Sequence, residues 1–340
     1  MYQMLNEMAG RKAVDLLHIT MPSNYQALLG RFLWERHRIP YILDYTDPWV
    51  PESDQGAQFP SKAWASYKLA DILEPVAAAH ASGLAGITEK YFAGVLRRNP
   101  QLHDVPRAAF QMGCSKFDHE KARQLRIPVR RLEKSSPLQQ IVYAGALLPK
   151  AIEPMRCFLR ALATINSSGL KDHPIRFICL GTGSSRDDPS SHQILPIARS
   201  VGAEEWVREY PERHPYLEVL ATLAAADGGV ILGSTEPHYS PSKLFEALLA
   251  GRPVLAVLHR QSEAAAILKN SGGGIALTFD SILDKERLTE DCVRLFQSWP
   301  TPCAPPIKWE SLAQHDIAVI AEKVAAFYDE VIAYHERENS

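Results

Sequence analysis

Several features of extracellular, membrane-spanning and metal-binding proteins are missing from this sequence. The five cysteines form no C-x-x-C pair and are odd in number, which favours reduced thiols and gives no zinc site. No apolar run is long enough to span a bilayer, and the N-terminal residues lack the long apolar core of a secretory signal. The formal net charge of -2 provides no bulk attraction for nucleic acid. We therefore expect a cytoplasmic protein that needs no metal or cofactor.

The sequence does contain an ordinary globular composition and two series of alternating elements. Its 340 residues, 46% hydrophobic and 22% charged, suit two domains of usual size. Strand and helix patterns alternate in the first half, which is typical of a parallel sheet. Expected strands lie at 14–20, 41–45 and 86–88, and expected helices at 24–36, at 61–82 with an interruption near Pro75, and at 89–98.

A second series follows a charged stretch with prolines at 116–137, which we interpret as a domain linker. A last amphipathic helix is expected from about residue 311. The predicted domains are therefore 1–134, 135–310 and a C-terminal helix, 311–340. The strands of the second series are expected at 140–146, 175–180, 229–233, 253–257 and 274–278. Two Rossmann-like parallel-sheet domains facing a cleft fit this pattern, with ligands beyond the carboxyl ends of the strands.

The segment SPSKLFEALLAGRPVLAV, residues 240–257, carries the most informative polar residues. Ser240 and Pro241 predict a helix start, and Gly251 predicts its end. Lys243 then lies in the first turn, where a phosphate would gain from its charge and from the helix amides. Glu246 lies one turn further, where a carboxylate can accept hydrogen bonds from ribose hydroxyls. The competing interpretation is a simple surface ion pair worth only tenths of a kcal/mol.

The same segment resembles the nucleotide-sugar-binding segment of glycosyltransferases with the two-domain GT-B architecture, in particular the large retaining family 4. IVYAGALLPK (141–150), RFICLGTG (176–183) and PYLEVLATLAAADGGVIL (215–232) are also similar to this family. In the N-terminal half, LDYTDPW (43–49) and FQMGCSKFD (110–118) are weaker matches. The resemblance implies a glycosyltransferase that uses a nucleotide-diphosphate sugar, retains configuration and needs no metal.

The resemblance also implies roles for individual residues. It assigns Glu246 to the donor ribose, Ser242, Lys243 and Leu244 to the nucleotide, and Lys150 to charge neutralisation of the diphosphate. Gly145 would let the loop approach the diphosphate, and Gly181 and Gly183 would line the base and ribose. His238 and Asp47 are candidates for contacts to the donor or acceptor sugar. His18, at the end of a strand, either acts in the site together with Lys243 and Lys150 or is a structural histidine.

Three features depart from the family pattern. His238 occupies the position of the first glutamate of a paired motif, where the nearest acid is Glu236. Ala146 stands where an arginine is common. The sequence also begins at a point that resembles the interior of the N-terminal domain, so that the first strand–helix units are expected to be missing.

The implied function is sugar transfer to a glycan or lipid-linked acceptor in polysaccharide or cell-envelope biosynthesis. Two alternatives stay open at this point: a degenerate protein that binds a nucleotide or a partner without catalysis, and a nucleotide-sugar epimerase. No nucleic acid is expected as a partner. Peripheral association with the inner face of the membrane, through basic pairs such as Arg97–Arg98 or Arg130–Arg131, competes with a simple solvated surface.

Overall fold

The chain forms two compact units in the computed structural model, which describes residues 1–21, 24–50, 59–133, 137–169, 173–183, 191–236, 241–280, 284–299 and 305–338. Unit 1 consists of Met1–Met112 and Ile317–Ser340, and unit 2 consists of Gly113–Asp316. Each unit contains one parallel sheet covered by helices, so the prediction of two parallel α/β domains is confirmed. The division differs from the predicted boundaries at 134 and 310, because 113–133 and 311–316 belong to unit 2.

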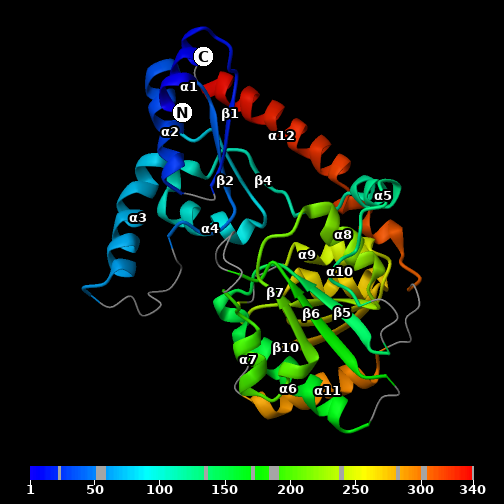
Figure 1. Ribbon diagram of the computed structural model, residues 1–340. Coiled ribbons are helices and arrows are strands. Elements are labelled where there is room, and N and C mark those ends of the chain that lie inside the picture. The colour runs from blue at the N-terminus through cyan, green and yellow to red at the C-terminus, as the bar shows by residue number, and fades with distance from the viewer. Residues whose placement is uncertain are drawn as a thin grey trace. The chain divides into compact units, whose positions relative to one another are not determined.

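Unit 1 is built on a four-stranded parallel sheet in the order β1-β2-β3-β4. Its α-helices occur before, between and after the strands. The last of them, α12, belongs to unit 1 although it follows the whole of unit 2 in the sequence (Figure 1). The strands are β1 (Leu17–Thr20), β2 (Tyr41–Tyr45), β3 (Gly83–Gly86) and β4 (Arg107–Ala109). The helices are α1 (Tyr2–Gly10), α2 (Ala27–His37), α3 (Lys62–Ala78), α4 (Glu89–Arg98) and α12 (Ile317–Glu338), with 3-10 turns at Asn24–Gln26 and Pro100–Leu102.

The two faces of this sheet are covered by different helices, because side chains alternate along a strand. Tyr41, Leu43 and Tyr45 of β2 pack with residues of α2, α3 and α4. Ile42 points to the other face and packs with Phe327 and Val331 of α12. The last helix of the chain thus completes the core of unit 1 (Figure 1).

Unit 2 contains a six-stranded parallel sheet in the order β10-β9-β8-β5-β6-β7. The strand order runs one way from β5 through β6 to β7, and the other way from β8 to β10, so the topological switch lies between β5 and β8. The strands are β5 (Gln139–Ala144), β6 (Ile175–Leu180), β7 (Val207–Tyr210), β8 (Gly228–Leu232), β9 (Val254–His259) and β10 (Gly274–Phe279). Ligands of open parallel sheets bind beyond the carboxyl ends of strands at such a switch.

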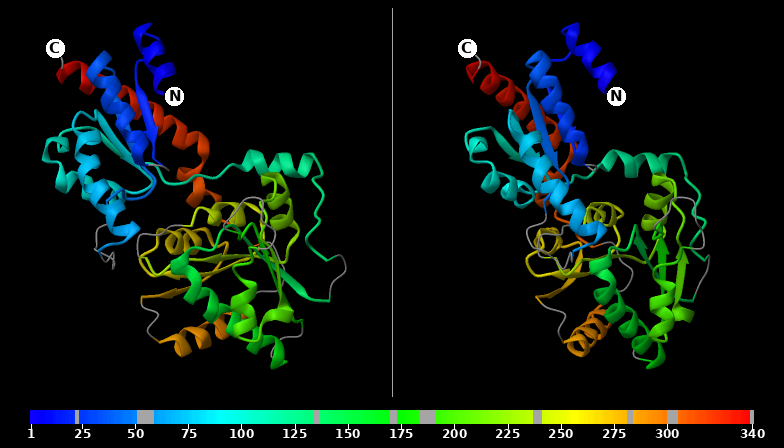
Figure 2. Two further views of the ribbon diagram at one scale, coloured as in Figure 1. Left: turned by 60° about the vertical axis from the view of Figure 1, so that its left-hand side comes forward. Right: turned by 90° about the vertical axis from the view of Figure 1, so that its left-hand side faces the viewer.

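Helices cover both faces of the unit 2 sheet (Figure 2). The helices α6, α7 and α11 form the larger core with one face, while α8, α9 and α10 pack on the other. Their bounds are α5 (Lys116–Gln124), α6 (Ile152–Ser167), α7 (Leu195–Ser200), α8 (Tyr216–Ala225), α9 (Lys243–Leu249), α10 (Glu263–Ser271) and α11 (Lys285–Gln297). The 3-10 turns lie at Pro149–Ala151, Glu204–Trp206 and Trp309–His315.

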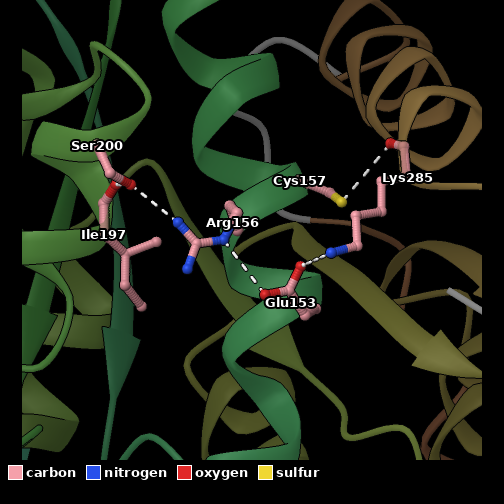
Figure 3. Close-up of polar contacts among 6 residues, drawn as sticks. All are labelled: Glu153, Arg156, Cys157, Ile197, Ser200 and Lys285. Atoms are coloured by element: carbon pink, nitrogen blue, oxygen red, sulfur yellow. Dashed lines mark hydrogen bonds and ion pairs between the residues drawn. The ribbon is translucent and has the colours of Figure 1, made fainter.

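Polar contacts connect α6 to α7 and α11, the two helices that cover the same face of the sheet (Figure 3). Glu153 pairs with Lys285 of α11 at 2.7 Å and with Arg156 at 3.3 Å. Arg156 also donates to Ser200 of α7 at 2.9 Å. These partly exposed contacts hold α6 between α7 and α11, on the face opposite to α8 and α9.

Five local predictions need correction. The strand expected at 86–88 is β3, which runs from Gly83 to Gly86. The helix α3 runs through Pro75 without interruption. The expected linker contains α5, where Ser115 caps the helix and His119 and Ala122 form the buried face that the surrounding charges conceal. The strand β7 was not predicted, because Arg208 and Glu209 occupy two of its four positions. The final α-helix begins at Ile317 rather than near residue 311, after a 3-10 turn.

Candidate functional site

A cavity of about 460 Å³ lies in unit 2 at the topological switch of the sheet. The cavity is lined by residues from the ends of β5 and β6, from the loop after β7, and from α8 and α9. The floor between the sheet and α8 is apolar, whereas the rim carries charged side chains. The lining residues are Val142, Ala144, Gly145, Ala146, Leu180, Gly181, Arg213, His214, Tyr216, Val219, Leu223, Val230, Ile231, Ser242, Lys243, Glu246 and Ala247.

Lys243 is the first residue of α9, and its side chain crosses the cavity to the loop after β5. Its Nζ donates to the Ala146 carbonyl oxygen at 3.0 Å and to the Tyr143 hydroxyl at 3.2 Å. Both acceptors are neutral, and no described carboxylate forms an ion pair with this amine. Burial lowers the pKa of Lys243 to about 8. The amine is therefore held without the negative partner that a buried ammonium normally requires.

Gly145 makes this close approach possible. A Cβ atom at this position would collide with the Lys243 side chain, and the glycine has a φ of 127°, which L-residues rarely adopt. The Gly145 amide also donates to the Leu180 carbonyl oxygen at 2.7 Å, which ties the loops after β5 and β6 together. Gly145 and Lys243 are thus brought together, with the amine directly against the glycine loop.

Glu246 lies one turn after Lys243 and lines the same cavity. Its Oε2 atom is buried and has no hydrogen-bond partner among the described residues. Burial, followed by the charge of Asp118, raises the pKa of this carboxyl. Because a buried acceptor without a partner costs free energy, the geometry is that of a site that a ligand hydroxyl would complete.

The remaining residues predicted to contact the nucleotide divide into two groups. Ser242 and Gly181 line the cavity, and Gly181 has a φ of 66° at the turn after β6. Gly183 does not line it and packs instead against Ser191 and Pro211. Leu244 is 1% exposed and belongs to the core between α9 and the sheet, so its side chain does not face the cavity.

The glycine turn after β6 is held by a buried carboxylate that the sequence did not reveal. Glu209 of β7 accepts from the Thr182 hydroxyl at 2.5 Å. It also accepts from the backbone amides of Gln193, Ile194 and Leu195 at 2.7 to 3.0 Å. One side chain thereby fixes both the turn that carries Gly181 and the start of α7.

Lys150 lies outside the cavity wall. Its Nζ is 2.6 Å from the Glu236 carboxylate in a partly exposed ion pair, and the Thr235 amide donates to the Lys150 carbonyl oxygen at 3.1 Å. These contacts join the segments after β5 and β8. The predicted role of Lys150 at the diphosphate therefore has no support from the cavity geometry. His238 lies outside the described residues.

The two candidates from the N-terminal half, His18 and Asp47, lie in unit 1. Asp47 is exposed in the segment that follows β2. Both ring nitrogens of His18 have partners: Nε2 lies 3.1 Å from Asp44 Oδ2, and Nδ1 lies 2.8 Å from the Tyr328 hydroxyl of α12. These contacts favour the structural interpretation of His18.

Three residues of the cavity wall were missed: Arg213, His214 and Tyr216. They follow β7, and the failure to predict that strand concealed their position at the carboxyl edge of the sheet. Burial, with the nearby Glu246 and Asp118 charges, raises the pKa of Tyr216 to about 12. The periodic Val207 and Glu209, buried on either side of exposed Arg208, were the signal that could have revealed the strand.

Two further classes of site find no support in the described part of the chain. Among these residues, no group of three or more His, Cys, Asp or Glu side chains is placed to hold a metal ion. None of the described helices combines the length and the apolar character needed to cross a membrane.

The fold is similar to that of several glycosyltransferases of solved structure. Sucrose-phosphate synthase from Thermosynechococcus elongatus matches 98% of this chain over 77% of its own, at 15% identity and a TM-score of 0.64. A trehalose 6-phosphate synthase from Burkholderia multivorans matches 100% of this chain over 75% of its own, at 15% identity and a TM-score of 0.68. The structure of Anabaena HepE in complex with UDP-glucose matches 96% of this chain and 81% of the HepE chain, at 16% identity and a TM-score of 0.61.

These proteins have the GT-B architecture, and the similarity extends over both units of this chain. No family model and no curated protein matches the sequence. At these identities the comparison establishes the fold.

Proposed function

We propose that this chain is a glycosyltransferase that takes a sugar from a nucleoside-diphosphate sugar and transfers it to a hydroxyl of a glycan or lipid-linked acceptor. The observation that carries this proposal is the pair Lys243 and Glu246. Both are half-buried and line one cavity at the topological switch, and among the described residues neither has an ion-pair partner, while the Glu246 Oε2 atom also has no hydrogen-bond partner. Structural neighbours that bind UDP-glucose or form UDP support the choice of donor class.

In this proposal the two side chains bind the two polar parts of one ligand. A diphosphate at Lys243 would replace neutral acceptors by an anion and restore the amine to its charged form. Gly145 lets the Lys243 amine lie directly against the loop after β5, because a Cβ atom at this position would collide with that side chain. The ribose hydroxyls would donate to Glu246, whose Oε2 has no partner in the described structure.

The chemistry would rest on stabilising the leaving group. The bond between the anomeric carbon and the diphosphate oxygen breaks, its electron pair leaves with the phosphate, and an oxocarbenium-like state develops. The acceptor oxygen then bonds to the anomeric carbon, and its proton passes to the departing diphosphate oxygen. Protonated Lys243, next to the charge that develops on the phosphate, would lower the barrier by preorganised electrostatics.

The finer parts of the proposal come from the family resemblance. We propose that transfer retains the anomeric configuration and does not need a divalent cation. We also propose that the acceptor belongs to polysaccharide or cell-envelope biosynthesis and that the protein acts in the cytoplasm, peripherally at the inner face of the membrane. NMR of the product anomer, assays with a chelator and vesicle sedimentation test these points in turn.

The central experiment measures UDP and UDP-glucose binding by calorimetry for the wild type, for Glu246→Gln and for Glu236→Gln. Glu246→Gln should weaken binding about tenfold or more, because a charged acceptor is lost from a buried site. Glu236→Gln makes the same chemical change outside the cavity and should have little effect. Equal affinity of the wild type and Glu246→Gln would contradict the ribose assignment, and absence of any nucleotide binding would contradict the proposed function.

One observation favours a second candidate, a protein that binds the nucleotide and assists a partner without transfer. Lys150 is held by Glu236, and Ala146 provides no side-chain charge at the glycine loop, so Lys243 is the one cationic side chain that the described structure aims at that loop. Donor hydrolysis and transfer to a panel of acceptors distinguish the two functions. Nucleotide binding without either reaction would favour the binding protein.

A further inference from the structure

One wall of the cavity has no role in the proposed contacts to phosphate and ribose. This wall is the loop after β7, where Arg213 and His214 line the cavity beside Tyr216 of α8. In the sheet, β7 lies two strands away from β5, whose loop contacts Lys243. Since neighbouring strands are about 4.8 Å apart, the two walls are separated by about 10 Å. A ligand that contacts both must be elongated, as a nucleotide is.

His214 is the polar residue of this wall whose bonding is incomplete. Its side chain is only 5% exposed, and its Nε2 atom has no hydrogen-bond partner among the described residues. The carboxylate of Glu212 lies 3.8 Å from this atom, which is too far for a hydrogen bond, and accepts instead from Arg131 at 2.9 Å. A buried nitrogen in this state is stabilised by a ligand or a water molecule that bonds to it.

The surroundings of His214 suit a flat, largely apolar ring with a polar edge. Leu180, Val219 and Leu223 line the same cavity between the sheet and α8. Glu246 and Tyr216 line the same cavity, and the Glu246 charge adds to the effect of burial in raising the pKa of the Tyr216 hydroxyl, so the ribose position adjoins this slot. The order of the walls is therefore Lys243, Glu246, His214, which matches the order phosphate, ribose, base in a nucleotide.

Glu212 also decides what His214 can recognise. A neutral imidazole carries one proton, and a carboxylate near Nε2 favours the tautomer with the proton on that nitrogen. Nε2 then donates, so it pairs with a carbonyl oxygen and leaves an exocyclic amino group without an acceptor. A site that is built to bond one group rejects the analogue in which that group has the wrong polarity.

We propose that His214 determines the base specificity of the donor site: its Nε2 donates to the carbonyl oxygen at C4 of a pyrimidine or C6 of a purine, so that keto bases are preferred to bases with an amino group at that position. This inference rests on the proposed function, since it assumes that a nucleotide occupies the cavity. It assigns the loop after β7 to base recognition and identifies uracil and guanine nucleotides, rather than cytosine and adenine nucleotides, as the class of donor.

The experiment uses the full chain and measures dissociation constants for the matched pairs UDP and CDP, and GDP and ADP. In the pair that binds tighter, the keto member should bind at least tenfold tighter than the amino member, as expected for one buried hydrogen bond. His214→Phe keeps a ring and removes the donor, and should reduce this ratio to below threefold. His214→Gln supplies an amide donor and should restore part of it. His173→Phe, the same change at an exposed position of unit 2, should leave the ratio unchanged.

A second variant tests the tautomer while leaving the imidazole in place. Glu212→Gln, at a position 31% exposed, should lower the ratio several-fold without affecting folding. A wild-type ratio close to one, or an undiminished ratio in His214→Phe, would overturn the base assignment. If none of the four nucleotides binds the wild type, the proposed function fails, which is a distinct result.

Discussion

The two units treat their candidate polar residues in opposite ways. In unit 1, His18 bonds at both ring nitrogens, to Asp44 of β2 and to the hydroxyl of Tyr328 on α12. In unit 2, Lys243 is bonded only to neutral oxygens, and one oxygen of Glu246 and one nitrogen of His214 have no partner in the described structure. Both ring nitrogens of His18 have partners within unit 1, whereas the cavity of unit 2 contains groups that a ligand would complete. This difference distinguishes residues that stabilise the fold from residues whose polar groups are available to a ligand.

The largest effect is expected where unit 2 itself contains a complete network. Glu209→Ala removes an acceptor from Thr182 and three backbone amides and leaves them buried, so it should destabilise the protein by about 3 kcal/mol. Urea unfolding measures this change. Glu205→Ala, an exposed glutamate of the same unit, is the control, with an expected change of less than about 0.5 kcal/mol. Equal stabilities of the two variants would show that Glu209 does not stabilise the turn after β6 and the start of α7.

The incomplete site should respond in ligand affinity and in its pH dependence. Lys243→Met should weaken nucleotide-diphosphate binding about tenfold or more, while the unliganded protein stays as stable as the wild type or gains stability. Calorimetry and thermal unfolding measure the two quantities. If Lys243→Met instead lowers the stability of the unliganded protein and leaves nucleotide affinity unchanged, Lys243 stabilises the fold and is not a ligand-binding residue.

The lowered pKa of Lys243 fixes the direction of its pH effects. The protonated amine binds the anion, so wild-type affinity should fall as the pH rises through about 8, and this fall should be absent in Lys243→Met. Because the folded-state pKa lies below the ordinary lysine value, the unfolded chain binds more protons between these pH values. The contribution of Lys243 to unliganded stability should therefore rise with pH from about 8 to about 10.4. Urea unfolding across this range tests the sign.

The network of unit 1 should give a smaller effect, and on stability. Tyr328→Phe removes one hydrogen bond to His18 Nδ1 and should cost about 1 kcal/mol of unfolding free energy. Nucleotide affinity should be unchanged, since both residues lie in unit 1 and the cavity lies in unit 2. A change in transfer rate with unchanged stability would instead return His18 to the list of catalytic candidates.

The smallest effect is expected for the partly exposed ion pair. Glu236→Gln leaves Lys150 without its carboxylate partner but should change stability by less than about 1 kcal/mol. A gain in nucleotide affinity of more than about 1 kcal/mol in this variant would show that Glu236 competes with a phosphate for Lys150. The site would then extend beyond the cavity wall.

Much of the fold followed from local pattern. Tyr41–Tyr45 and Ile175–Leu180 are strands with the expected bounds, and Glu89–Arg98 is a helix with the expected bounds, because apolar runs and capping residues act over a few positions. β7 was missed because Arg208 and Glu209 occupy two of its four positions, and the partners that satisfy buried Glu209 are remote in sequence. The segment around Lys243 and Glu246 was recognised from its helix-start residues, from the strand and loop before it, and from its resemblance to the nucleotide-sugar-binding segment of GT-B glycosyltransferases.

The sequence by itself determined that two parallel α/β domains would form, and its resemblance to GT-B glycosyltransferases predicted one site for Lys243, Glu246 and Gly145, which line the same cavity. The prediction of the fold depends on short-range periodicity and on glycine and proline at element ends, whereas the prediction of the site depends on motifs that resemble those of the family. Only the tertiary structure decided which groups are left incomplete: it paired Lys150 with Glu236, buried Leu244, enclosed His18 between Asp44 and Tyr328, and brought His214 to the cavity. The reason is that hydrogen-bond satisfaction and burial depend on which strands become neighbours, and in this sheet β5 lies between β8 and β6.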